Sequence, residues 1–294
     1  MQLGALVPFN DTGGEASLVR DFALNVEALG YDFLEAPDHV LGGRPEPGAT
    51  AFADGMYHDP FVLLGYLAAC TTRLEFSTGV LILPQRQTAL VAKQAACLDV
   101  LSGGRFRLGI GVGWNPVEFT GLNENFHNRG RRSEEQVQVM QALWTAPHIN
   151  YQGRYHTIDD AGINPRPAAR RIPVWYGGHH EHTLPRIAKW GDGWMPNAYP
   201  PDQAALDIFT TLRKLTEEAG RDPAAVGIEV WTSCGDTTEA DWRKEVAFWK
   251  QAGASHICLT TTFNRRHHHR IAGKTAADHL AVLKRYHAAV ADLL

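Results

Sequence analysis

The chain has few of the residues that mark secreted or metal-binding proteins. Its 294 residues include four cysteines, scattered singly without a CxxC pair: Cys70, Cys97, Cys234 and Cys258. This spacing predicts neither a disulfide framework nor a zinc site, and we expect four buried, reduced thiols. Reduced thiols are typical of cytoplasmic proteins, so we expect the protein in the cytoplasm.

Long apolar runs and a large excess of one charge are also missing. The longest apolar stretch, around Phe61–Cys70, is too short to span a bilayer and contains Gly65. The first residues enter a strand-like run without a basic region, so we expect no signal peptide. Because the net charge is only -4, we expect the protein to bind neither nucleic acid nor membranes.

What the chain does contain is a regular alternation of short apolar strands and helices. Seven of eight strand-like segments are followed by a helical segment, which predicts a (β/α)8 TIM barrel, with a doubly wound open sheet as the alternative. We expect one domain over residues 1–294, with loop insertions at the carboxyl-terminal face of the barrel. The predicted strands are Leu3–Pro8, Tyr31–Ala36, Arg73–Leu81, Phe106–Ile110, Ile172–Tyr176, Gly193–Met195, Val226–Thr232 and His256–Thr260.

The loops that follow the strands of such a barrel carry its function. Asp38 and His39 follow the second predicted strand. A histidine there can act as a general base or stabilise developing charge, because its proton is labile near neutral pH. The alternative is a solvated pair of loop residues without a function.

Glycines mark three other strands. In Thr78-Gly79-Val80 the glycine predicts a bulge or the close approach of a flat ligand, unless it serves barrel packing alone. The segment Gly109–Gly113 lacks G-x-G-x-x-G spacing, and it indicates either backbone close to a flat cofactor or a barrel corner. Gly177-Gly178 precedes a predicted helix, so its amides predict an anion site, with a tight turn as the alternative.

Histidine-rich segments lie on the same face. Arg265-Arg-His-His-His-Arg270 follows the last predicted strand, and we expect a mobile basic loop that could contact an anionic tail of a ligand. Four adjacent residues cannot converge on one metal, and His179, His180 and His182 do not form an H-E-x-x-H motif. We therefore expect no metal site.

Taken together, these segments resemble the luciferase-like monooxygenase superfamily over nearly the whole chain. That resemblance implies a (β/α)8 barrel that uses reduced FMN or the deazaflavin coenzyme F420. The amino-acid sequence around Ser77–Pro84 and Gly111–Trp114 is most similar to that of the F420-dependent branch. The resemblance is carried by Leu34–His39, Ser77–Pro84, Ala92–Asp99, Leu101–Trp114, Arg129–Arg132, Ile172–Gly178 and Gly191–Trp194.

The resemblance also implies roles for individual residues. His39 would be catalytic, facing the cofactor ring and assisting proton or hydride transfer, and the Gly79–Val80 bond would be cis. Gly177, Gly178 and His179 would hold the cofactor phosphate. The full set of expected cofactor contacts is Asp38, Thr78, Gly79, Val80, Gly111, Gly113, Trp114, Gly177, Gly178 and His179.

One position departs from part of the superfamily. Deazaflavin-dependent sugar-phosphate dehydrogenases place a glutamate after the fourth strand, where this chain has Trp114. This difference argues against sugar-phosphate activity and suggests an aromatic pocket wall. Glu118 lies a helical turn further on, and we do not expect it to take over the role.

The expected function is that of an oxidoreductase that transfers a hydride between F420 and a small organic substrate. One alternative is a two-component monooxygenase that receives reduced FMN from a partner reductase, and another is a barrel that binds a flavin without turnover. We expect a small-molecule substrate, apolar or aromatic because Phe52, Tyr57, Trp114 and Phe119 lie in the loops that would form its pocket. The loops that would form the pocket are Val40–His58, Trp114–Asn128 and Asn264–Lys274. A homodimer is a further expectation.

Overall fold

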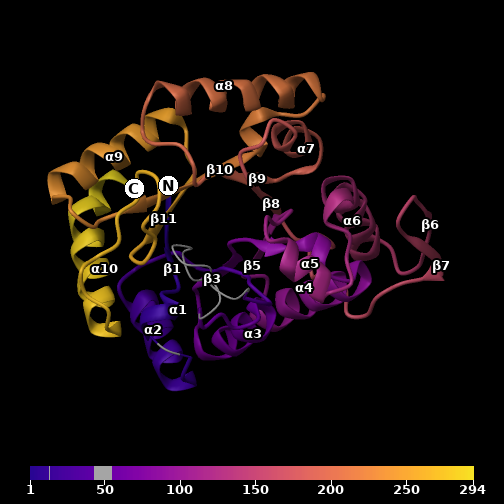
Figure 1. The fold of residues 1–294 in the computed structure, drawn as a ribbon, viewed down its shortest axis with the longest axis horizontal. Coiled ribbons are helices and arrows are strands. Elements are labelled where there is room, and N and C mark those ends of the chain that lie inside the picture. Colours follow the sequence, from indigo (N-terminus) through magenta and orange to yellow (C-terminus); the bar gives the residue numbers. More distant parts are fainter. Residues whose placement is uncertain (13, 43–54) are drawn as a thin grey trace.

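Parallel strands close into a barrel with helices on its outside (Figure 1). The computed structural model describes residues 1–12, 14–42 and 55–294. The strands follow the order β3-β2-β1-β11-β10-β9-β8-β5-β4, and pairing of β3 with β5 closes the ring. The predicted (β/α)8 barrel is confirmed, and the open-sheet alternative is wrong. The barrel strands are β1 (Gln2–Leu6), β2 (Phe33–Ala36), β3 (Glu75–Thr78), β4 (Leu81–Ile82), β5 (Phe106–Gly111), β8 (Val174–Gly177), β9 (Gly193–Met195), β10 (Gly227–Ser233) and β11 (His256–Thr260).

The third predicted strand is divided in two by a cis peptide bond between Gly79 and Val80. The cis bond that the resemblance implied is therefore confirmed. Both halves, β3 and β4, pair with β5, so together they occupy one strand position. A Cβ atom at position 79 would overlap the carboxyl group of Glu35, so this position accepts only glycine.

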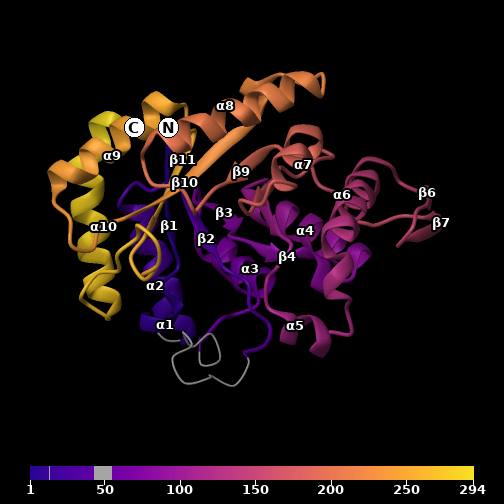
Figure 2. The same cartoon turned by 45° about the horizontal axis from the view of Figure 1, so that its top comes forward.

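In the part of the chain that the structure describes, eight longer helices surround the barrel, as Figure 2 illustrates. Their ends follow local capping rules: Asp59 accepts hydrogen bonds from the first amides of α3, and Gly103 ends α4 in the left-handed conformation. None of the helices in the described ranges is long and apolar enough to cross a membrane. The helices are α2 (Ala16–Ala28), α3 (Pro60–Cys70), α4 (Thr88–Ser102), α6 (Arg129–Thr145), α7 (Thr183–Trp190), α8 (Gln203–Glu218), α9 (Glu239–Ala252) and α10 (Ala276–Val290).

Short elements complete the chain. A hairpin is formed by β6 (Ile149–Gln152) and β7 (Thr157–Ala161), and it projects beyond α6 in both views (Figures 1 and 2). The other short helices are α1 (Phe9–Thr12), α5 (Pro116–Gly121), η1 (Leu83–Gln85), η2 (Phe126–Asn128), η3 (Pro223–Ala225) and η4 (Ala291–Leu293).

The barrel interior contains charged side chains as well as apolar ones. Arg107 Nη2 lies 2.6 Å from Glu229 Oε2, and the guanidinium stacks over Phe33. Trp231 donates its indole N–H to Glu35 over 3.0 Å. Burial and the neighbouring Glu229 raise the pKa of Glu35 well above its usual value, so they favour the protonated form of this carboxyl group beneath Gly79.

The thiols are less uniform than the sequence predicted. Cys234 and Cys258 are buried, but Cys70 and Cys97 are only half-buried, so the expectation of four buried thiols was wrong for two. Burial raises the pKa of the Cys234 thiol to about 12, which keeps it protonated and unreactive.

One stability prediction arises from Glu245 of α9. Burial raises its pKa from 4.5 to about 7, although Trp249 Nε1 donates a hydrogen bond to it over 3.2 Å. The unfolded chain therefore ionises first, and the free energy of unfolding falls as pH rises from about 4.5 to about 7. Since one pKa unit corresponds to about 1.4 kcal/mol, Glu245→Gln should stabilise the fold by about 1–3 kcal/mol at pH 8.

Urea unfolding at pH 5 and pH 8 measures this effect. Little gain is expected at pH 5, where Glu245 is protonated in the folded protein. The matched control is Glu217→Gln on the exposed face of α8, which should change stability little at either pH. An equal gain for Glu245→Gln at both pH values would contradict the titration argument.

Candidate cofactor site

A cavity of about 360 Å³ lies where β4, β5 and β8 end. Val80, Ile82 and Ile110 form an apolar wall at one end, whereas Ser133, Thr183 and Arg186 supply polar groups elsewhere. This volume is within the range of small-ligand sites, and barrels place their chemistry at this end of the strands. The cavity also contacts seven of the ten expected cofactor residues, namely Val80, Gly111, Gly113, Trp114, Gly177, Gly178 and His179.

A second hollow, of about 440 Å³, is larger but lies at the opposite end of the barrel. It includes Gly227 and Ile228 at the start of β10, and Gly253 and Ser255 just before β11. Because loops at the amino-terminal end of barrel strands serve stability rather than catalysis, we place the candidate site in the smaller cavity.

Val80 is held in place by two of the predicted glycines. A Cβ atom at Gly111 would lie 2.6 Å from Val80 Cγ2, and one at Gly177 would lie 2.8 Å from Val80 Cγ1. Gly111 was expected to bring the backbone close to a flat cofactor, and Gly177 was expected to help hold the cofactor phosphate. The structure shows that they make room for Val80, which itself lines the cavity.

Asp38 and Thr78 point into the protein rather than into the cavity. Asp38 accepts hydrogen bonds from Ile82 N over 3.0 Å and from Arg86 Nη2 over 2.7 Å. Thr78 Oγ1 donates to the carbonyl oxygen of Gly109 over 2.6 Å. Both side chains are buried, and they fix the backbone on either side of the cis bond. Expected as cofactor contacts, they instead support the residues that form the wall.

His39 lies beside a carboxylate that the sequence argument set aside. Its Nδ1 atom is 3.5 Å from Glu118 Oε1. Glu118 is 1% exposed, and the same oxygen accepts hydrogen bonds from Val40 N over 2.8 Å and Leu41 N over 3.3 Å. Burial opposes ionisation of Glu118, but contacts with His39 and the amides outweigh it and lower its pKa. A carboxylate at one ring nitrogen fixes the tautomer and orientation of a histidine.

Two aromatic rings complete the surroundings of His39. The Tyr57 ring lies 5.0 Å away, and the Trp114 ring lies 6.2 Å away in an edge-on arrangement. Trp114 is 58% exposed and lines the cavity at its rim. His39 is therefore next to the cavity wall, with Glu118 behind it.

The sequence did contain a signal for Glu118. Asn115-Pro116 begins α5 directly after Trp114, and Asn115 Oδ1 accepts a hydrogen bond from Val117 N over 3.2 Å. Asparagine at the cap followed by proline is a standard helix start. Glu118 was set aside as a helical turn beyond Trp114, so the turn that brings it back to His39 was missed.

At Gly177-Gly178 the local structure differs from the prediction of an anion site directly before a helix. Gly178 has a φ of 101°, and α7 begins only at Thr183, so no helix start directly follows the glycines. Hydroxyl and guanidinium donors for an anion come instead from the side chains of Ser133, Thr183 and Arg186, which line the same cavity. Arg186 is also paired with Glu134.

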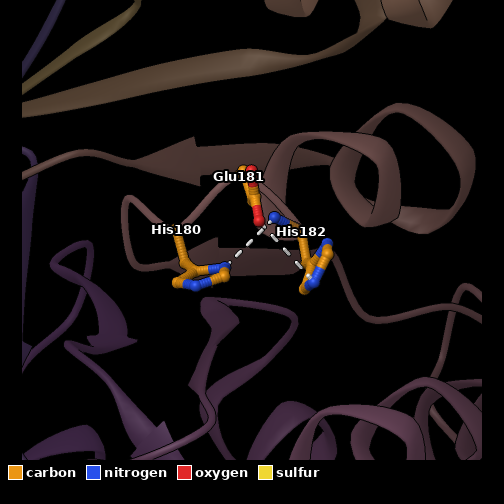
Figure 3. Close-up of side chains that lie close together, drawn as sticks. All are labelled: His180, Glu181 and His182. Atoms are coloured by element: carbon orange, nitrogen blue, oxygen red, sulfur yellow. Dashed lines mark hydrogen bonds and ion pairs between the residues drawn. The ribbon is translucent and has the colours of Figure 1, made fainter.

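Three side chains between Gly178 and α7 gather at the protein surface (Figure 3). Potential ligand atoms of His180, Glu181 and His182 lie within 4.8 Å of one another. His182 N donates to His180 Nδ1 over 3.3 Å, and His182 Nε2 lies 3.9 Å from Glu181 Oε1. All three residues are exposed, so their hydration competes with binding of an ion, and we assign no metal to them.

The basic segment Arg265–Arg270 was expected to be mobile, but it is packed onto the barrel. His268 is 2% exposed and its Nε2 atom lies 3.2 Å from the carbonyl oxygen of Asn197. Arg270 Nη2 lies 2.7 Å from Asp11 Oδ2. These contacts correct the expectation.

The expected substrate loops are described only in part. Residues 43–54, which include Phe52, lie outside the described residues. Phe119 is 1% exposed and packs against Phe126, with ring centroids 5.2 Å apart, so it belongs to the core rather than to the cavity wall.

The barrel and this cavity define a (β/α)8 protein with a ligand-sized cavity, lined by apolar and polar residues, at the carboxyl-terminal end of its strands. The chain belongs to the luciferase-like monooxygenase family, whose sequence profile matches residues 1–292. The family resemblance inferred from the sequence is confirmed, and the family supports enzyme activity as an oxidoreductase or monooxygenase.

Individual relatives differ in their described activities. An uncharacterised protein of Mycobacterium tuberculosis, Rv0940c, is 36% identical over 66% of this chain and 70% of its own length. The pyrimidine monooxygenase RutA of Allorhizobium ampelinum is 34% identical over 57% of this chain and 47% of its own. The F420-dependent hydroxymycolic acid dehydrogenase of M. tuberculosis is 27% identical over 73% of this chain and 58% of its own.

Solved structures support the fold. An F420-dependent secondary alcohol dehydrogenase, determined with an F420-acetone adduct, matches with a TM-score of 0.79. The match covers 98% of each chain at 19% sequence identity, so it is a likeness of fold.

Proposed function

We propose that this protein is an F420-dependent oxidoreductase that transfers a hydride between the deazaflavin and a small organic substrate. The observation that carries the proposal is the His39–Glu118 pair next to Trp114 in the wall of a cavity that also has polar and cationic lining residues. The F420-dependent dehydrogenase among the relatives and the F420-dependent alcohol dehydrogenase among the solved structures support this choice of cofactor.

The residues of the cavity fit a cofactor of this shape. A deazaflavin has a flat ring, a polyol chain and a phosphate, which call for an apolar surface, hydrogen-bonding groups and cationic or hydroxyl donors. Val80 and Ile110 supply the apolar surface, and Thr183 and Arg186 supply the hydroxyl and cationic donors. Tyr176 also lines the cavity, and its buried hydroxyl has no hydrogen-bond partner among the described residues. A polar group of a ligand would satisfy it.

The bound deazaflavin would supply hydride transfer with little reactivity toward oxygen. His39 would hold the proton that the substrate oxygen loses or gains as the hydride moves. Glu118 would keep the imidazole oriented. Val80 would support the ring, while Ser133, Thr183 and Arg186 would bind the phosphate.

The second candidate is a monooxygenase that uses reduced FMN supplied by a reductase. The similarity to RutA favours it, and the same Val80 wall and His39 suit a flavin ring. A barrel that binds a flavin without turnover is the third candidate. Loss of turnover on removal of His39, with cofactor binding kept, would exclude that third candidate.

Titration of the purified protein with F420 and with oxidised and reduced FMN separates the first two candidates. Fluorescence or calorimetry should give a dissociation constant for F420 at least about tenfold below that for FMN, a difference of about 1.4 kcal/mol. Preference for reduced FMN would replace the proposal with the monooxygenase. Binding of neither cofactor would exclude both.

A further inference from the structure

Arg266 stands beside His179 at the edge of the cavity, and Arg265 precedes it in the same loop. Arg265 and Arg266 are exposed residues of the loop that follows β11. Arg266 Nη2 lies 3.2 Å from Nε2 of His179, and His179 lines the cavity. The loop after β11 thus reaches the loop after β8 at the edge of the candidate phosphate site.

The arginines are held by a loop with many internal contacts. His268 packs edge-on against Phe263, with ring centroids 5.7 Å apart, and Phe263 packs against Trp231 at 5.2 Å. Ser233 Oγ accepts a hydrogen bond from His269 N over 3.0 Å, and Gly235 N donates to His269 O over 3.0 Å. Since the backbone is fixed before any ligand binds, the entropy cost of presenting the guanidinium groups is small.

The charges around the loop favour an anion. Burial, followed by Arg266, lowers the pKa of both His179 and His267, so the positive charge at neutral pH comes from the two arginines. Opposing carboxylates are present: Asp202 acts on His267, and Glu181 lies in the loop that contains His179. Guanidinium groups can bind carboxylates through two parallel hydrogen bonds, which a neutral histidine cannot provide.

We propose that Arg265 and Arg266 bind the polycarboxylate tail that continues beyond the phosphate of F420. This inference rests on the proposed function. The chain of FMN ends at its phosphate, so it lacks the carboxylates that continue beyond it. The loop after β11 would therefore distinguish the two cofactors through the part of F420 that takes no part in hydride transfer.

The test compares dissociation constants for three ligands: F420 with several glutamates in its tail, F420 without glutamates, and FMN. The wild-type protein should bind the glutamate-bearing form about tenfold more tightly than the tail-free form. The double variant Arg265→Ala/Arg266→Ala should lose that difference and keep its affinity for the tail-free form. Lys284→Ala, which removes a charge from the exposed side of α10, is the matched control and should leave all three constants unchanged.

Each outcome has a distinct meaning. Equal wild-type affinity for both forms of F420 would overturn the proposal, and this comparison needs no variant to fold. An equal loss of affinity for both forms of F420 in the double variant would also overturn the proposal. Binding of FMN with no binding of either F420 form would refute the proposed function itself. A tail preference that disappears in the double variant and weakens with added salt would support the inference.

Discussion

Replacement of His39 with alanine should lower turnover by about 10²–10³-fold, because positioned acid–base groups contribute that much to proton transfer. Its Nδ1 atom faces Glu118, and it lies next to the cavity wall at Trp114. The dissociation constant of the cofactor should change by less than about threefold, since binding depends on groups elsewhere in the cavity. Steady-state kinetics and a cofactor titration on the same preparation test both parts.

Glu118→Gln tests whether the carboxylate acts through His39. The amide keeps an oxygen for Val40 N and Leu41 N but removes the negative charge. Turnover should fall by about tenfold in the wild-type background and change little in His39→Ala, because the two groups act as a unit. The control is His148→Ala, on the exposed β6–β7 hairpin, which should retain full activity.

Two results would contradict this account. Equal effects of Glu118→Gln with and without His39 would show that the carboxylate supports the fold rather than the histidine. Loss of cofactor binding in His39→Ala would show that the imidazole binds the cofactor, and the drop in turnover would then not report proton transfer.

Replacement of Gly109 with alanine should destabilise the barrel by about 3 kcal/mol, near the upper limit for overpacking of a core. A Cβ atom there would overlap the backbone oxygen of Thr78 and lie 2.8 Å from Met195 Sδ. The carbonyl group of Thr78 cannot move away easily, since it belongs to a strand that pairs with both β2 and β5. Thermal unfolding should show a fall in Tm of about 5–10 °C.

Gly65→Ala is the matched control for this substitution. Gly65 lies inside α3, and a Cβ atom there would have no neighbour within 4 Å. Alanine should therefore stabilise the helix by about 0.5–1 kcal/mol, because it restricts the unfolded chain and favours helix. A variant at Gly109 that unfolds within about 1 °C of the wild type would show that the strands can separate without cost.

Much of the architecture could be predicted because its signals are local. Apolar strands, helix caps and the glycines that end helices depend on residues within a few positions of one another. The sequence thus indicated eight strand positions, the bulge at Gly79 and the group of loops after the strands. It also indicated the residues around Val80 and Gly177 that line the cavity.

The roles of individual side chains could not be predicted in the same way. Asp38 and Thr78 stand next to cavity residues in sequence, yet their partners are Arg86 and Gly109 on other elements. Glu118 was set aside for its distance along the chain from the fourth strand, although it lies 3.5 Å from His39.

By itself, the sequence determined the barrel, the family and the place of the candidate cavity, because short-range patterns and family motifs specify them. Only the tertiary structure decided that Glu118 faces His39 and that Arg266 lies next to His179. It also decided that Gly111 and Gly177 leave room for Val80. The physical reason is that closing the barrel brings residues from separate loops together. Pairs such as His39 and Glu118, or His179 and Arg266, have no shared local pattern that could reveal them.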